Sequence, residues 1–143
     1  MLGYKLNIDN STKTGKKNAG SILVLDDDHD ITSLVKISLE KQGYQVFGFT
    51  DPLLALEHFQ LNPSMYDLVL SDLRMPGMYG FQFLNKIKLT KPKIKVLLMS
   101  AFDMTSDSEF STCSKSYEID GFIQKPISIR KLNELIKSYM TSK

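Results

Sequence analysis

The sequence predicts an α/β fold in which a doubly wound, five-stranded parallel sheet carries helices on both faces. From Ser21 onward, five short apolar runs alternate with segments whose apolar residues recur at helical spacing. The first run, residues 22–25, is continuously apolar, as in a strand that is buried on both faces of a parallel sheet. Four of the five runs end abruptly in polar residues, which predicts a polar site along one edge of the sheet.

The first two strand–helix units are predicted as follows. Residues 22–25 form the first strand, and the next helix carries a periodic set that Gly43 terminates: Ile31, Leu34, Val35, Ser38 and Leu39. Residues 46–49 form the second strand. Asp51 and Pro52 then begin a helix as N-cap and first helical residue, and its inward side is predicted to be Leu53, Leu56 and Phe59 or Gln60.

The remaining units are predicted in the same way. The third strand, residues 68–70, leads through a turn at 75–78 into a helix over 80–90, with Phe83, Leu84 and Ile87 facing inward. Residues 96–99 form the fourth strand and 121–124 the fifth, whereas the polar segment 104–118 predicts only a weak helix. The last helix is predicted to bury Ile129, Leu132, Leu135, Ile136 and Tyr139.

The composition of the chain indicates a single globular domain and argues against a nucleic-acid-binding protein and a membrane-spanning one. The 143 residues, 42% of them hydrophobic, suit one domain over 21–143 after a flexible tail over 1–20. The tail carries a charge of +3 and the remainder −1, so a basic surface that binds nucleic acid is not indicated. No apolar run approaches the roughly 20 residues of a membrane span. The single cysteine, Cys113, permits no internal disulfide, which is consistent with a cytoplasmic location.

Polar residues at four strand ends indicate the chemistry. They are Asp26 and Asp27, Asp72, Ser100, and Lys125. The carboxyl ends of parallel strands meet at one edge, where neighbouring carboxylates need a counter-charge and oxygen ligands suit Mg²⁺. A carboxylate can also attack phosphorus, and a lysine and a hydroxyl can stabilise the transferred group. Each residue taken singly has an ordinary interpretation, as a helix cap, turn former, surface lysine or loop serine. His29 is expected to be exposed, and His58 to lie on a helix surface.

Four segments in order resemble the response regulator receiver domains of two-component signalling. They are ILVLDDD (22–28), YDLVLSDLRMPGM (66–78), LLMSA (97–101) and GFIQKP (121–126). Within this family the chain resembles the chemotaxis regulators. The resemblance implies a flavodoxin-like fold with strand order 2-1-3-4-5. It also implies that a histidine kinase or phosphotransfer protein donates a phosphoryl group to the chain. Mg²⁺, or Mn²⁺ in its place, would be required, and the protein would be a switch rather than an enzyme with an external substrate.

The resemblance also implies the role of each site residue. Asp72 matches the phosphoacceptor, Asp27 the direct metal ligand, Asp26 its acidic neighbour, and Arg74 a backbone carbonyl ligand. Ser100, Ala101 and Lys125 match the groups that contact the phosphoryl group, and Phe122 matches the aromatic switch residue. The peptide bond between Lys125 and Pro126 matches one that is usually cis. Arg74 and Phe102 match the positions that flank the hydrolytic water, and their bulk predicts slow self-dephosphorylation.

Two alternative functions remain open at this point. An Asp-nucleophile, Mg²⁺-dependent phosphohydrolase usually needs a second acid two residues after the nucleophile, where this chain has Arg74. A degenerate receiver would only bind partners, but no acidic, hydroxyl or lysine position is missing. The chain is expected to be a single-domain regulator or a fragment of a longer one, and a monomer or a phosphorylation-dependent dimer. The long polar segment between Ser100 and Lys125 departs from the family pattern.

Overall fold

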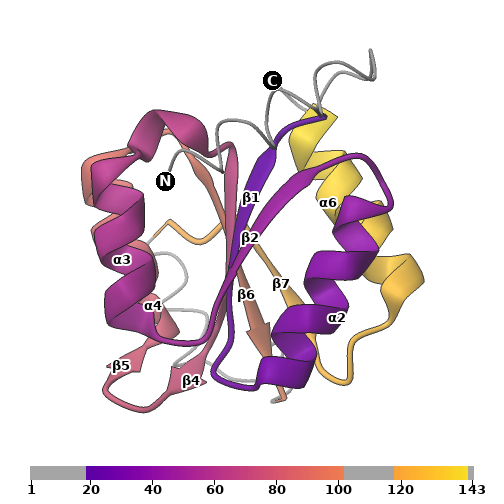
Figure 1. The fold of residues 1–143 in the computed structure, drawn as a ribbon, viewed down its shortest axis with the longest axis horizontal. Helices are drawn as coiled ribbons and strands as arrows, with labels where there is room; N and C mark the ends of the chain where they lie inside the picture. Colours follow the sequence, from indigo (N-terminus) through magenta and orange to yellow (C-terminus); the bar gives the residue numbers. More distant parts are fainter. Residues whose placement is uncertain (1–18, 102–117, 142–143) are drawn as a thin grey trace, which may run out of the picture.

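A five-stranded parallel sheet forms the centre of the computed structural model, which describes residues 19–101 and 118–141. Its strands are β1 (Ser21–Leu25), β2 (Gln45–Phe49), β3 (Leu68–Asp72), β6 (Lys95–Ser100) and β7 (Gly121–Gln124). They lie in the order β2-β1-β3-β6-β7, and every neighbouring pair is parallel (Figure 1). Counted over these five strands the order is 2-1-3-4-5, so the predicted topology is confirmed.

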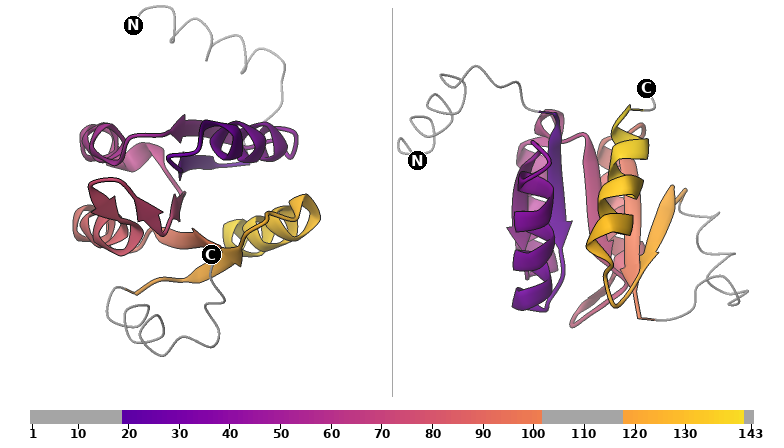
Figure 2. Two further views of the ribbon diagram at one scale, coloured as in Figure 1. Left: turned by 90° about the horizontal axis from the view of Figure 1, so that it is seen from below. Right: turned by 90° about the vertical axis from the view of Figure 1, so that its right-hand side faces the viewer.

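Helices cover both faces of the sheet (Figure 2). The helices are α2 (His29–Glu40), α3 (Pro52–Leu61), α4 (Gly80–Thr90) and α6 (Ile129–Thr141), with a short 3-10 turn η1 at Pro63–Met65. α2 and α6 pack on one face, and α3 and α4 pack on the other (Figure 1). This arrangement confirms the doubly wound, flavodoxin-like architecture.

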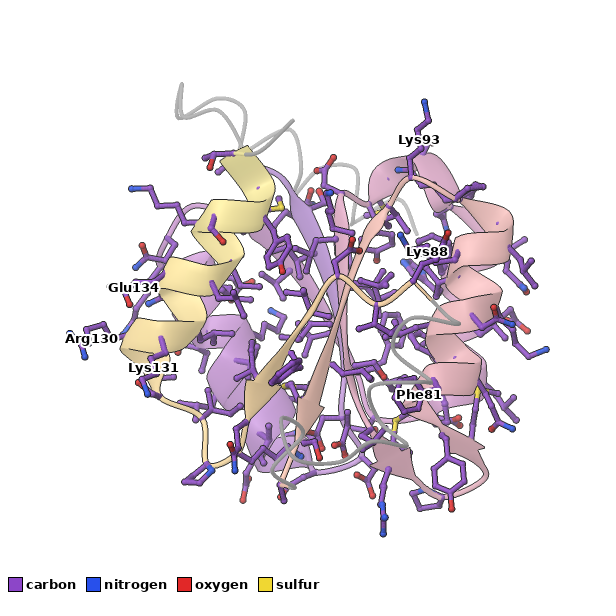
Figure 3. All side chains as sticks on the ribbon, turned by 180° about the vertical axis from the view of Figure 1, so that it is seen from behind. Phe81, Lys88, Lys93, Arg130, Lys131 and Glu134 are labelled. Atoms are coloured by element: carbon purple, nitrogen blue, oxygen red, sulfur yellow. The ribbon has the colours of Figure 1, made fainter. Side chains whose placement is uncertain are left out.

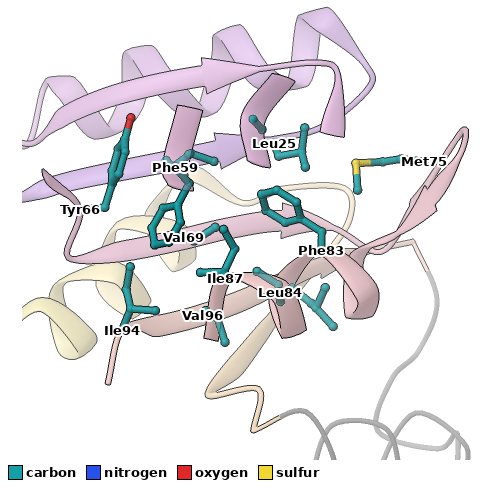
Figure 4. Close-up of a cluster of buried hydrophobic side chains, with 13 residues drawn as sticks. Leu25, Phe59, Tyr66, Val69, Met75, Phe83, Leu84, Ile87, Ile94 and Val96 are labelled. Atoms are coloured by element: carbon teal, nitrogen blue, oxygen red, sulfur yellow. The ribbon is translucent and has the colours of Figure 1, made fainter. Parts of the chain in front are cut away.

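Alternation along the strands divides the apolar core between the two faces. In β1, Ile22 and Val24 face α2 and α6, whereas Leu23 and Leu25 face α3 and α4. Figure 4 shows the cluster on the face that α3 and α4 cover, where side chains of these helices meet those of the strands. Because β1 is buried on both faces, its sequence is continuously apolar rather than alternating.

Local signals fix where the helices begin and where the chain turns. The Asp28 side chain caps α2 by accepting a hydrogen bond from Asp30 N–H at 2.9 Å. The Asp51 side chain caps α3 by accepting from Leu53 N–H at 2.9 Å, and Pro52 is the first helical residue, as predicted. Gly43, with φ of +98°, turns the chain between α2 and β2 in a conformation that favours glycine.

Leu53, predicted on the inward side of α3, faces solvent instead. It is 65% exposed, so that prediction was wrong, and Leu34 in the periodic set of α2 is 46% exposed. The buried positions are Thr32, Val35, Ser38 and Leu39 in α2, and Pro52, Ala55 and Phe59 in α3. In α3, leucines occur around most of the helix circumference, so periodicity alone could not identify the buried side.

The histidines differ in their surroundings. His29 is exposed in the first turn of α2, as expected. His58 was expected on a helix surface, but it lies half-buried, with its ring against Phe47 and Phe49. Its Nε2 shares a hydrogen bond of 2.6 Å with the hydroxyl of Tyr66, which is fully buried. Burial lowers the pKa of His58 and raises that of Tyr66, so neutral forms are favoured on both sides of this contact.

His58 should make stability depend on pH. Its folded pKa is lowered, so the unfolded chain takes up a proton first, and the stability contributed above pH 6.5 is lost as the pH falls. The test is urea unfolding at several pH values between about 5 and 8, the range in which histidine titrates. As the pH falls, wild type should lose stability relative to His58→Gln. A difference between the two proteins that does not change with pH would contradict the prediction.

Short elements complete the fold outside the main sheet. The strands β4 (Arg74–Met75) and β5 (Met78–Tyr79) pair antiparallel, so the predicted turn at 75–78 lies in a small hairpin. Figure 3 shows Arg130, Lys131 and Glu134 on the outer side of α6, while Leu132 and Ile136 are buried. Within 19–101 and 118–141, no helix is long and apolar enough to cross a membrane. The predicted tail up to residue 18 and most of the predicted weak helix at 104–118 lie outside the described residues.

Candidate functional site

The polar ends of four neighbouring strands lie at one edge of the sheet. Asp26 follows β1, Asp72 ends β3, Ser100 ends β6, and Lys125 follows β7. The register places Asp72 opposite Met99, the residue before Ser100, and Ser100 opposite Gln124, the residue before Lys125. Parallel pairing therefore brings residues that are up to 99 positions apart in the sequence to the same edge.

Three carboxylates form the centre of this edge. Asp26, Asp27 and Asp72 each place one carboxylate oxygen within 4.8 Å of the others. Asp26 is fully buried and Asp72 is 7% exposed, whereas Asp27 is open to solvent. Buried like charges at this range repel one another, and a hard divalent cation such as Mg²⁺ prefers oxygen ligands of this kind. The donor set therefore fits a magnesium ion.

Lys125 provides positive charge between two of the carboxylates. Its Nζ lies 2.8 Å from Asp26 Oδ2 and 3.2 Å from Asp72 Oδ1. The amine donates a hydrogen bond to Asp72, but Asp26 Oδ2 has no well-directed hydrogen bond within the described chain. We regard the contact with Asp26 as an ion pair, because 2.8 Å is a short separation for opposite charges at any angle.

The acids and the lysine shift one another's pKa values. Burial, followed by repulsion from Asp26, raises the pKa of Asp72 to about 6, although Lys125 offsets part of the rise. Burial by itself would lower the pKa of Lys125, but Asp26 and Asp72 outweigh it and the pKa is raised. At pH 7 Asp72 is therefore mostly ionised and Lys125 is charged, which is the state that a carboxylate nucleophile and its cation require.

Backbone contacts hold the ends of the strands in place. Asp26 N–H donates to Phe49 O at 3.1 Å, and Asp28 N–H donates to Asp26 Oδ1 at 2.9 Å. Lys125 N–H donates to Ser100 O at 2.7 Å, which joins the end of β7 to the end of β6. The peptide bond between Lys125 and Pro126 is cis, the isomer that the resemblance implies.

The other predicted site residues surround this centre. Arg74 is exposed in β4, two residues after Asp72, and Ser100 is 2% exposed at the end of β6. Ala101 is exposed directly after Ser100, and Phe122 in β7 is 38% exposed. Phe102 lies outside the described residues, so its predicted role rests on the sequence alone.

Gly80 was not predicted as part of the site, yet it touches the backbone of Asp72. A Cβ added to this first residue of α4 would lie 2.3 Å from Asp72 O and 3.0 Å from Leu73 Cα. Gly80 N–H also donates to Leu73 O at 2.7 Å, while Leu73 N–H donates to Met99 O at 2.8 Å. The start of α4 and strand β6 thus hold the peptide after Asp72 from two sides, and only a residue without a side chain fits there.

Gly80→Ala should therefore displace the Asp72 backbone. We expect a loss of roughly 1–3 kcal/mol of stability, the usual cost of overpacking, together with slower phosphorylation, the reaction that the resemblance implies for Asp72. Gly121→Ala is a matched control, since its Cβ would lie 2.5 Å from the Tyr139 hydroxyl, on the far half of β7. Urea unfolding should show that both variants lose stability. Phosphorylation by acetyl phosphate should be slower in Gly80→Ala only. Equal rates would contradict the prediction.

Comparison with known proteins gives one consistent result. Residues 22–137 match the family described as the response regulator receiver domain. The chain is 31% identical over 124 residues to sporulation initiation phosphotransferase F of Bacillus subtilis, covering 85% of this chain and 94% of that protein. It is 35% identical over 111 residues to the transcriptional regulatory protein ZraR of Klebsiella oxytoca, covering 78% of this chain but only 24% of that protein.

Solved structures agree with the sequence comparisons. The crystal structure of a CheY-like response regulator receiver domain protein from Methanospirillum hungatei superposes with a TM-score of 0.77 at 29% identity. The match covers 85% of this chain and 93% of that one. The five-stranded sheet and its helices are therefore shared with this structure over almost its whole length.

Proposed function

The chain belongs to the response regulator receiver family of two-component phosphorelay signalling, and from this premise we propose that Asp72 accepts the phosphoryl group. The observation that carries the proposal is the buried Asp72 carboxylate, 3.2 Å from the Lys125 amine, with the acids Asp26 and Asp27 beside it. The donor would be a phosphohistidine of a histidine kinase or of a phosphotransfer protein. The protein would act as a cytoplasmic switch, without an external substrate to turn over.

The reaction that fits this geometry is a displacement at phosphorus. An ionised Asp72 oxygen attacks the phosphorus atom, the new O–P bond forms, and the N–P bond to the donor histidine breaks. The leaving imidazole takes up a proton, and the product is an acyl phosphate on Asp72. Phosphoryl transfer of this kind depends on positioning and on charge stabilisation rather than on acid–base chemistry by the protein.

Each neighbouring group has a place in this reaction. Asp27, Asp26, Asp72 and the Arg74 backbone carbonyl would hold Mg²⁺ or Mn²⁺, which when bound neutralises the carboxylates and the phosphoryl oxygens. Lys125 would remain beside the transferred group as a point charge. The Ser100 hydroxyl and the Ala101 N–H would donate hydrogen bonds to it. Phe122, in the strand that leads into Lys125, would change its packing when Ser100 moves, and so alter the surface that a partner reads.

Incubation with acetyl phosphate and Mg²⁺, followed by intact mass measurement, tests the proposal. We expect one stoichiometric phosphoryl adduct that Asp72→Asn abolishes. Asp30→Asn is a matched control, because Asp30 is an exposed acid in the first turn of α2. A phosphohydrolase would consume the substrate without a stable adduct, and a degenerate receiver would form neither adduct nor product. Either result would overturn the proposal.

Arg74 and Phe102 support the further proposal that dephosphorylation is slow. Both side chains are bulky and neither is suited to orient an attacking water molecule in the positions they would occupy. After the phosphodonor is removed, the adduct should persist far longer than seconds. Arg74→Asn, which places a smaller amide there, should shorten its half-life by about tenfold, within the range that one positioned polar group typically contributes. A wild-type half-life of seconds would contradict this proposal.

A further inference from the structure

Thr32 in α2 connects that helix to the acidic end of β1. Its side chain is buried, and its hydroxyl donates to Asp26 O at 2.8 Å in a fully buried hydrogen bond. The same hydroxyl lies 3.1 Å from Asp28 O, the carbonyl one helical turn earlier. One side chain is thus bonded to the backbone on both sides of Asp27.

The methyl group of Thr32 occupies the space beside Gly48 in β2, where a side chain would otherwise lie. A Cβ added to Gly48 would lie 2.8 Å from Thr32 Cγ2, which is closer than real Cβ contacts. Gly48 pairs with Val24 in β1, two residues before Asp26. Because threonine is stiff about χ1, space for the methyl group also sets the direction of the hydroxyl. Gly48 therefore helps to aim the Thr32 hydroxyl at Asp26 O.

Asp27 depends on its backbone for its position. Within 19–101 and 118–141, its carboxylate makes no hydrogen bond or ion pair, whereas the Asp26 carboxylate is held by Asp28 N–H and Lys125. The carbonyl that Thr32 binds belongs to the peptide joining Asp26 to Asp27, so its orientation determines where the Asp27 side chain leaves the chain. Loss of that hydrogen bond would let this peptide rotate and would change the separation of the three carboxylates.

We propose that Thr32 is a positioning residue that orients the peptide between Asp26 and Asp27 so that the three carboxylates can hold a divalent cation. The inference rests on the proposed function, in which this cluster binds Mg²⁺. Groups that orient metal ligands from behind typically change metal affinity by 10–100-fold when they are removed, roughly the range expected here. The effect should appear in Mg²⁺ binding itself, before any phosphoryl transfer.

A hydrogen bond within the helix is the alternative role for this hydroxyl. Serine and threonine often bond to the carbonyl four residues earlier, and the contact with Asp28 O has this form. Within the part of the chain that the structure describes, the Ser38 hydroxyl in the same helix makes only such a bond, to Leu34 O at 2.8 Å, and is similarly buried. Ser38→Ala therefore removes a helical hydroxyl contact without touching the acidic residues, and serves as the control.

Titration calorimetry of the full chain with Mg²⁺, without phosphodonor, tests the inference. Thr32→Val should weaken Mg²⁺ binding by about tenfold or more, while Thr32→Ser and Ser38→Ala should bind nearly as wild type. Circular dichroism and urea unfolding in EDTA establish that each variant is folded. Wild-type affinity in Thr32→Val would overturn the inference alone, whereas a wild-type protein that does not bind Mg²⁺ would overturn the proposed function and the inference together.

A second pair of variants keeps the test valid if Thr32→Val does not fold. Gly48→Ala should push the Thr32 methyl group aside and weaken Mg²⁺ binding while the hydroxyl is still present. Adding Thr32→Ser to Gly48→Ala removes the crowded methyl group and should restore the affinity. An unchanged affinity in Gly48→Ala, or a double variant that is no better than Gly48→Ala, would overturn the inference.

Discussion

Asp72→Asn should stabilise the metal-free protein by about 3 kcal/mol at pH 7, because it removes a buried negative charge that burial and Asp26 both oppose. The magnitude follows from the rise of the pKa of Asp72 from 3.8 to about 6, at about 1.4 kcal/mol for each pKa unit. Asparagine resembles the protonated carboxyl, so the variant approximates wild type with the charge removed. The ionised Asp72 carboxylate is thus expected to lower the stability of the folded protein.

The pH dependence gives this prediction a definite sign. The folded state holds its proton on Asp72 more tightly than the unfolded chain does, so wild type loses stability as the pH rises from about 4 to about 6. Above about pH 6, the stability of wild type no longer changes through the titration of Asp72. Urea unfolding in EDTA at several pH values should show the advantage of Asp72→Asn growing through the window and then staying constant. An advantage that is the same at pH 4 and pH 7 would contradict the prediction.

Lys125→Met should have the second large effect, in the opposite direction. It removes the amine that lies 2.8 Å from Asp26 and 3.2 Å from Asp72, and leaves two buried carboxylates without a counter-charge. Removal of one partner from a buried ion pair typically costs about 3–5 kcal/mol. Metal-free Lys125→Met should therefore unfold at much lower urea concentration than wild type at pH 7, and protonation of Asp72 at lower pH should recover part of the loss.

Lys88→Met provides the comparison for this effect. Lys88, on α4 (Figure 3), is also largely buried, but it pairs at 3.5 Å with one partly exposed acid, Asp120. Its loss should cost less than that of Lys125, because Lys88 pairs with one carboxylate that is 23% exposed rather than with two that are buried. The double variant Lys125→Met with Asp72→Asn should regain much of the lost stability, because only the Asp26 carboxylate is then left without a counter-charge. Equal losses in Lys125→Met and Lys88→Met would contradict the argument.

The fold could be predicted from the sequence because strands that are buried on both faces have an unmistakable composition. Residues 22–25, 68–70 and 96–99 are continuously apolar, and each lies inside a strand of the sheet. Sides of helices were harder to predict. Leu53 was expected inside and Ala55 was not, since α3 has leucines on several sides and only packing against the sheet selects among them.

Much of the site was also foreseeable, since parallel strands bring their carboxyl ends together. The proximity of Asp26, Asp27, Asp72 and Lys125 follows from this rule. Thr32, Gly48 and Gly80 could not be predicted, because their importance depends on which backbone atoms lie beside them. A threonine in a helix or a glycine at its start has no distinctive sequence pattern, and His58 likewise showed its buried contacts only in three dimensions.

The lysine between the acids has a consequence for the order of events at this edge. Three ionised aspartates and one ammonium group leave an excess of two negative charges, which a single divalent ion would cancel. A dianionic phosphoryl group that arrives afterwards would meet a neutral environment, whereas one that arrives first would be repelled. Under the proposed function, this charge balance would favour binding of the ion before the phosphoryl donor, so that the availability of the ion would gate the reception of the signal.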